Sequence, residues 1–144
     1  MTPPPAGRVR LSCRGDIPRL FAIRHAVAEN RLSDPEAVTP EDCERVIGEA
    51  AMFVWEEDGD ILGFSAADPD DGSVWALFVA PGQDGRGIGR ALLARACERL
   101  REAGHGVATL RTGAGTRAEG FYRAAGWIEQ RRDDKGEIVF RLPL

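Results

Sequence analysis

The stretch from Trp75 to Leu93 constrains this chain more than any other. It joins an apolar run to a Pro-Gly turn, then to three glycines at alternate positions, and then to residues with helical spacing. Gly85, Gly87 and Gly89 remove side chains where the chain enters the helix, so several backbone N–H groups can face one bound group. A helix start exposes about four unpaired N–H donors and about half a positive charge. The stretch therefore predicts a strand, loop and helix that hold an anion such as a pyrophosphate.

Length and charge narrow the function classes. The chain has 144 residues and a net charge of −4, which fits a single domain and argues against a nucleic-acid binder. Residues 1–7 predict a disordered tail, and residues 8–144 one domain. No apolar run approaches the roughly 18 residues of a membrane helix. Three widely spaced cysteines without a CxxC pair favour reduced thiols, and hence a cytoplasmic protein.

Hydrophobic periodicity predicts a mixed α/β domain in the order β-α-α-β-β-β-α-β-α-β-β. Asp16 is expected to cap the first helix, and Thr39-Pro40 to open the second. Residues 33–36 carry another helix-start signal. Thr116 and Glu119 match a capping box. Strands are expected near residues 8–13, 51–56, 61–67, 74–79, 107–110, 127–132 and 137–142, and helices near 17–28, 40–49, 88–104 and 116–126.

Other ligand loops fit these glycines less well. A phosphate-binding NTPase loop needs Gly-Lys-Ser/Thr, which is absent here. A dinucleotide fold needs GxGxxG early in a βαβ unit, whereas the run from Gly87 to Leu92 lacks the third glycine and follows three antiparallel-looking strands. A tight connection without a ligand would not need three alternate glycines, because each adds an entropic cost.

Two segments together resemble the GNAT superfamily of N-acetyltransferases. Asp84-Gly85-Arg86-Gly87-Ile88-Gly89 aligns with the family's Gln/Arg-x-x-Gly-x-Gly/Ala loop. The segment from Thr116 to Trp127, with its Phe-Tyr and Gly-Trp pairs, is similar to the second family signature. The resemblance implies a central mixed, mostly antiparallel sheet of six to seven strands flanked by about four helices. Asp84 and Gly115 depart from the family pattern, and we expect Asp84 to point to solvent or to contribute only its backbone.

The resemblance also implies a cofactor site for acetyl-CoA between the strand at 74–79 and the strand at 107–110. Backbone groups of Phe78 and Val79 would pair with the pantetheine arm, and an amide near Leu77 or Phe78 would stabilise the thioester oxygen. The pyrophosphate would be held by backbone amides of the loop and helix start, from Arg86, Gly87, Ile88, Gly89 and Arg90.

The resemblance implies that Tyr122 is the general acid for the departing thiolate, a role that suits a phenol of pKa about 10, which keeps its proton at neutral pH. Without the family motif, Tyr122 would be interpreted as a core aromatic residue beside Phe121. Glu29, Asp34 or a water chain remain open as the general base. Trp55, Phe64 and Trp75 are interpreted as core residues rather than as the lining of an acceptor pocket. No histidine pair has metal-ligand spacing, so no metal is expected.

The implied reaction transfers an acetyl group from acetyl-CoA to an amine, by direct attack of that amine on the thioester. The alternative is a regulatory module of the same fold that binds acetyl-CoA or CoA without catalysis. The acceptor, a small molecule or a peptide, is not specified by the sequence. The closing strands could pair within the monomer or across a homodimer.

Overall fold

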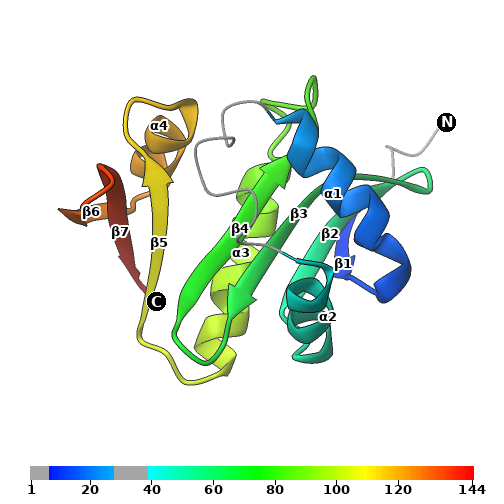
Figure 1. The fold of residues 1–144 in the computed structure, drawn as a ribbon, viewed down its shortest axis with the longest axis horizontal. Coiled ribbons are helices and arrows are strands. Elements are labelled where there is room, and N and C mark those ends of the chain that lie inside the picture. Colours follow the sequence, from blue (N-terminus) through cyan, green and yellow to red (C-terminus); the bar gives the residue numbers. More distant parts are fainter. Residues whose placement is uncertain (1–6, 28–38) are drawn as a thin grey trace, which may run out of the picture.

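The chain folds around a seven-stranded sheet with the strand order β1-β2-β3-β4-β5-β7-β6 (Figure 1). This computed structural model describes residues 7–27 and 39–144. Neighbouring strands are antiparallel except for β4 and β5, which are parallel. The strands are β1 (Arg8–Leu11), β2 (Met52–Glu57), β3 (Asp60–Asp68), β4 (Ser73–Val79), β5 (Val107–Gly113), β6 (Ile128–Arg132) and β7 (Glu137–Pro143).

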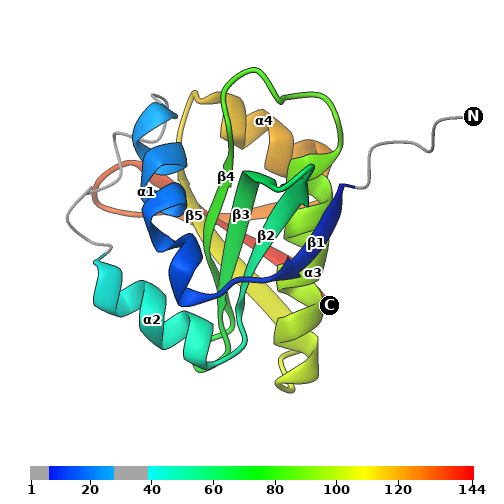
Figure 2. The ribbon, with the colours of Figure 1, turned by 90° about the vertical axis from the view of Figure 1, so that its right-hand side faces the viewer.

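Helices cover both faces of the sheet. One face carries α1 (Ile17–Ala26) and α2 (Pro40–Gly48), and the other carries α3 (Ile88–Glu102) and α4 (Arg117–Ala124), as Figure 2 shows. The predicted mixed, mostly antiparallel sheet with four helices is therefore confirmed. None of the helices in the described ranges is long and apolar enough to cross a membrane.

The predicted helix starts differ in how they are capped. The Thr39 hydroxyl accepts a hydrogen bond from the backbone N–H of Asp42, and the Asp42 carboxylate accepts one from the backbone N–H of Thr39, which completes a capping box. Thr116 likewise accepts from Glu119, but Glu119 accepts from Gly115 instead of Thr116. Residues 1–6 of the predicted tail and the helix signal at 33–36 lie outside the described residues.

Asp16 precedes α1 as predicted, but its side chain does not cap that helix. Its carboxylate accepts hydrogen bonds from the backbone N–H of Cys13 at 2.9 Å and from the Ser12 hydroxyl at 3.2 Å. Arg10 adds two more, at 3.0 and 3.1 Å, and also reaches Glu56 on β2. Asp16 is only 8% exposed, so these donors replace its water. The carboxylate thus ties β1 to the short turn that leads into α1.

Helix α3 lies very close to the sheet because β3 has a glycine beneath it. A Cβ atom at Gly63 would come within 2.9 Å of the Phe78 carbonyl oxygen and 3.0 Å of a Leu92 methyl group. The helix packs its buried face against this position, as its apolar spacing predicts. That face consists of Ile88, Leu92, Leu93, Ala96 and Leu100. Close packing here fixes where the first turn of α3 stands relative to β4.

Strands β4 and β5 make contact only at their beginning. Ser73 pairs with Thr109, and the Thr109 N–H donates to the Gly72 carbonyl at 3.1 Å. No further residue pair joins the two strands, although β5 continues to Gly113, beyond the predicted end at Leu110. Figure 1 shows the two strands diverging from that point. Beyond this pair the sheet divides into two halves, and one edge of β4 is left without a neighbouring strand among the described residues.

We expect the substitution Asp16→Asn to destabilise the fold by about 2 kcal/mol at neutral pH, because Arg10 loses a charged, largely buried partner. Burial opposes ionisation of Asp16, but hydrogen bonds from Arg10 and Cys13 outweigh it and lower the pKa of Asp16. The stabilisation is therefore present above about pH 4 and disappears as the pH falls through the folded-state pKa. Urea unfolding of both proteins between pH 3 and pH 7 measures this difference.

Glu44→Gln provides the matched control, since Glu44 pairs with Arg14 in solvent. Its cost should stay below about 0.5 kcal/mol. An Asp16→Asn protein no less stable than this control would contradict the role given to Asp16.

Candidate active site

A cavity of about 980 Å³ opens where β4 and β5 diverge. Its walls come from the end of β4, from the loop and first turn of α3, and from α4. The two segments that the sequence singled out, Trp75–Leu93 and Thr116–Trp127, thus meet in one cavity, although 22 residues separate them. The lining residues are Ala26, Val27, Leu77, Phe78, Val79, Pro81, Gln83, Asp84, Gly85, Gly87, Ile88, Gly89, Arg90, Arg117, Ala118, Gly120, Phe121 and Tyr122.

The register of β3 and β4 decides which backbone groups face this cavity. The Ala80 N–H donates to the Leu62 carbonyl at 2.8 Å, and hydrogen-bonded pairs alternate along an antiparallel ladder. The backbone of Phe78 is therefore directed to Phe64 on β3. Leu77 and Val79 direct their N–H and C=O groups to the opposite edge, where no residue of β5 pairs with them. Phe78 reaches the cavity through its side chain.

The glycine loop adopts the backbone conformation that glycine allows. Gly87 is the N-cap of α3 with φ of 84°, in the left-handed region that other residues rarely adopt. Ile88, Gly89 and Arg90 follow as the first turn, whose N–H groups have no partner within the helix. Gly87 to Arg90 all line the cavity, so the loop presents its donors to the space beside β4.

The Arg86 side chain is turned away from this cavity. Its guanidinium donates to Glu57 at 2.8 and 3.0 Å and to Gln83 at 2.7 Å. This bond to Arg86 lowers the pKa of Glu57. Arg86 therefore ties the loop to the end of β2 and leaves only its backbone for a ligand.

Both departures from the family pattern, Asp84 in the loop and Gly115 before the second signature, make specific contacts in the structure. The Asp84 carboxylate pairs with Arg117, the first residue of α4, at 3.0 Å. Both side chains are more than half exposed, as expected for Asp84. This pair joins the loop to α4 at the rim of the cavity. The Gly115 N–H, which lies just before α4, donates to the Glu119 carboxylate of α4 at 2.8 Å. This amide therefore already has a hydrogen-bond partner.

Tyr122 belongs to α4 and lines the cavity, and its side chain is buried. It is 8% exposed, and its ring makes edge contacts with Phe121 and Trp127 at 5.3 and 6.0 Å between centroids. Burial raises the pKa of Tyr122 well above its usual value, with a smaller contribution from the Cys97 thiol. In the described part of the chain, the Tyr122 hydroxyl has no hydrogen-bond partner. It therefore keeps its proton and has it available for a ligand.

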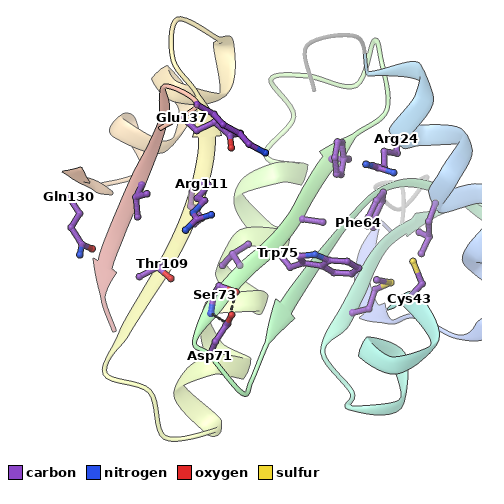
Figure 3. A pocket seen from close by; sticks show the side chains of 18 of the residues that line it. Arg24, Cys43, Phe64, Asp71, Ser73, Trp75, Thr109, Arg111, Gln130 and Glu137 are labelled. Carbon is purple, nitrogen blue, oxygen red and sulfur yellow. Dashed lines mark hydrogen bonds between the residues drawn. The ribbon is translucent and has the colours of Figure 1, made fainter. Parts of the chain in front are cut away.

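A second cavity of about 720 Å³ lies on the α1 and α2 side of the sheet (Figure 3). Phe78 lines both cavities, so they meet at the end of β4. Trp75 is an extra residue on β4, since Ala66 pairs with Ala76 and Ala67 with Val74. Such a bulge redirects a side chain. Phe64 and Trp75 do line this cavity, whereas Trp55 packs beside Gly7 and Glu57 elsewhere.

The polar side of the second cavity was missed by sequence reasoning. Its charged residues are Asp71 before β4, Arg111 from β5, Arg131 from β6, Lys135 before β7 and Glu137 from β7. The alternation of buried and exposed residues along 107–113 places Arg111 on one face of β5. Only the pairing of β5 with β7, and of β7 with β6, brings Arg111 and Arg131 to the same face of the sheet. Glu29 and Asp34, the carboxylates considered as general bases, lie outside the described residues. Elsewhere, Glu49, Asp68 and Asp70 hold carboxylate oxygens within 4.8 Å of one another, a grouping that spacing did not reveal.

A model of the acetyltransferase (GNAT) family matches residues 19–127. This range includes both sequence motifs and strand β4, which lines both cavities. The chain belongs to this family. The resemblance inferred from the glycine loop and the Thr116–Trp127 segment is thereby confirmed.

Related proteins agree with that membership. The chain is 42% identical over 87 residues to mycothiol acetyltransferase from Sanguibacter keddieii, a match that covers 54% of the chain and only 28% of that relative. It is similar to ribosomal-protein-alanine N-acetyltransferase from Brucella melitensis, with a TM-score of 0.78, 25% identity, and coverage of 95% and 99% of the two chains. PaiA N-acetyltransferase from Thermoplasma acidophilum, solved with coenzyme A, has a TM-score of 0.80 at 14% identity, covering 96% and 99%.

We expect Gly87→Ala to lower acetyl-CoA affinity by several fold and to cost about 1 kcal/mol of stability. No atom lies within 4 Å of the position that its Cβ would take, so the effect comes from the positive φ alone. Calorimetric titration and thermal unfolding measure the two effects. Gly48→Ala is the matched control, because its Cβ also meets nothing but its φ is ordinary. Unchanged affinity in Gly87→Ala would remove the loop conformation from the binding account.

Proposed function

We propose that this chain transfers the acetyl group of acetyl-CoA to an amine by direct attack of the amine on the thioester. One observation carries the proposal: a single cavity combines the unpaired edge of β4, the amide donors at the start of α3 and the Tyr122 hydroxyl. Membership of the GNAT acetyltransferase family supports it. The second cavity, which meets the first at Phe78, supplies a separate approach for the amine.

The parts of the cavity match the parts of acetyl-CoA. The pyrophosphate fits the donors from Gly87 to Arg90, where the helix dipole adds positive potential. The pantetheine arm carries amides that can extend the sheet by pairing with Leu77 and Val79. This assignment moves the predicted strand addition from Phe78 to Leu77, and it keeps Val79. The same outward-facing amides can stabilise the charge that develops on the thioester oxygen.

Tyr122 serves the departing thiolate. Because burial raises its pKa, the hydroxyl stays protonated over the whole physiological range. Full release of that proton would leave a phenolate in a buried site, which is costly. Its contribution is therefore a hydrogen bond to the sulfur, which strengthens as negative charge develops while the C–S bond breaks. The N–H proton that the attacking amine loses as the amide forms balances the departing thiolate as CoA thiol.

We expect Tyr122→Phe to lower kcat about 100-fold while acetyl-CoA affinity stays within about twofold. The hydroxyl has no partner in the described structure, so the melting temperature should hardly change. Release of CoA thiol with a panel of amines gives kcat, and calorimetric titration gives the affinity. Full activity in the variant would overturn the role of Tyr122.

The same two measurements on the unmodified protein separate the enzyme from a regulatory module of the same fold. Acetyl-CoA binding with amine-dependent thiol release supports the proposal. Binding without turnover on any amine would favour the non-catalytic module, and absence of binding would contradict both.

A further inference from the structure

We propose that the acceptor is a small amine that also carries a carboxylate, and that Arg111 and Arg131 bind this carboxylate. The inference rests on the proposed acetyl transfer and deepens it by naming the acceptor class. It is drawn from the second cavity, whose two walls differ in character (Figure 3). One wall is mainly apolar and belongs to α1, α2, β2, β3 and β4, with Arg24 of α1 as its charged residue. The other is polar and belongs to β5, β6 and β7.

The two arginines are placed by strand register. Val139 on β7 pairs with Arg111 on β5 and with Arg131 on β6. Residues directly opposite one another project to the same face of a sheet, so both guanidinium groups extend from the face that carries Val139. With about 4.8 Å between neighbouring strands, their Cα atoms stand roughly 10 Å apart. Two long side chains at that spacing can converge on one carboxylate between them.

Both guanidinium groups are available for a ligand. Within the described residues, neither Arg111 nor Arg131 has a hydrogen bond or an ion pair, and both are exposed. The chain pairs most of its other arginines, as Arg10 with Asp16 and Arg123 with Glu129 show. Arg24 and Lys135 line the same cavity, so its like charges repel one another and a bound anion reduces that repulsion. Arginine forks suit the planar geometry of a carboxylate in particular.

The acidic groups of the cavity argue for an acceptor with both charges. Asp71 is already engaged, since it accepts from the Ser73 N–H and hydroxyl at 2.9 and 2.6 Å. Glu137 stands on the same strand as Val139 and two residues away, so it shares the face of the arginines. A ligand that carries an ammonium group and a carboxylate therefore finds a partner for each charge on this wall.

The apolar wall indicates the rest of the acceptor. The Phe64 and Phe78 rings stack with their centroids 5.2 Å apart, and Trp75 lies beside them, as Figure 3 shows for Phe64 and Trp75. Phe78 lines the cofactor cavity as well, so this wall leads from the acceptor cavity to the cofactor cavity. A volume of about 720 Å³ is in the range of small-molecule sites. The cavity thus fits an amino carboxylate with an apolar side group.

The test compares matched pairs of acceptors, each an apolar amino acid and its carboxamide, in the thiol-release assay with the full chain. For the unmodified protein we expect kcat/KM to favour the carboxylate member by at least about tenfold. Arg111→Gln and Arg131→Gln should each reduce this preference, mainly through KM, and the double variant should abolish it. The carboxamide should react equally well with all variants. Arg101→Gln is the matched control, since Arg101 is exposed on α3 and lines neither cavity.

The possible outcomes are distinguishable. If carboxamides or simple amines react as well as the carboxylates, acetyl transfer stands and the acceptor class is wrong. A carboxylate preference that survives in the double variant would overturn the role of the two arginines. If the protein binds acetyl-CoA but acetylates no amine of either kind, the proposed function fails and the inference fails with it. A loss of preference that Arg101→Gln also shows would contradict a specific site.

Discussion

Everything in this site depends on the parting of β4 from β5 after a single residue pair. Parallel strands normally share a ladder along their length, yet here only Ser73 and Thr109 meet. The divergence leaves Leu77 and Val79 with backbone groups that no strand of the described residues pairs with. Unpaired amides in a largely apolar cleft are costly unless a ligand or water pairs with them. The fold therefore keeps an open position in its sheet, and an extended amide-bearing ligand can complete it.

Both cavities follow from this one feature. The strands separate with α3 and α4 on one side and α1 and α2 on the other, so the opening reaches both faces of the sheet. Phe78 belongs to both walls because its side chain faces α1 while the cofactor cavity opens beside it. In the proposed reaction, cofactor and acceptor would approach the end of β4 from different directions, which is what direct transfer between them requires. No covalent intermediate on the protein is needed for such an arrangement.

The start of α3 is held by contacts distant from the chemistry. Gly63 allows the helix to sit against β3, and Arg86 ties the loop to Glu57 at the end of β2. The donors at Gly87 to Arg90 are then fixed relative to the β4 edge before any ligand binds. Preorganised donors cost little to rearrange at the moment of binding. The same logic applies to Tyr122, whose ring is held by Phe121, Trp127 and Phe140.

The sequence was sufficient for the parts of the site that have local patterns. Alternate glycines after an apolar run predicted the loop, and the capping signal at Thr116 located the helix that carries Tyr122. The sequence could not predict which β4 amides face the opening, because this depends on which residues of β4 form the hydrogen-bonded pairs with β3. Nor could it join Arg111 to Arg131, since that requires the β5-β7-β6 order of the closing strands. Asp16 was misjudged for a similar reason: Arg10, its partner on β1, competes with the helix for its carboxylate.

Residue-resolved hydrogen exchange by NMR tests the central claim, that acetyl-CoA completes the open edge of β4. The amides of Leu77 and Val79 should exchange fast in the free protein and become strongly protected when acetyl-CoA is bound. The Phe78 amide, paired with β3, should be protected in both states and serves as the internal reference. Saturating binding of acetyl-CoA that leaves Leu77 and Val79 exchanging as fast as before would contradict the account.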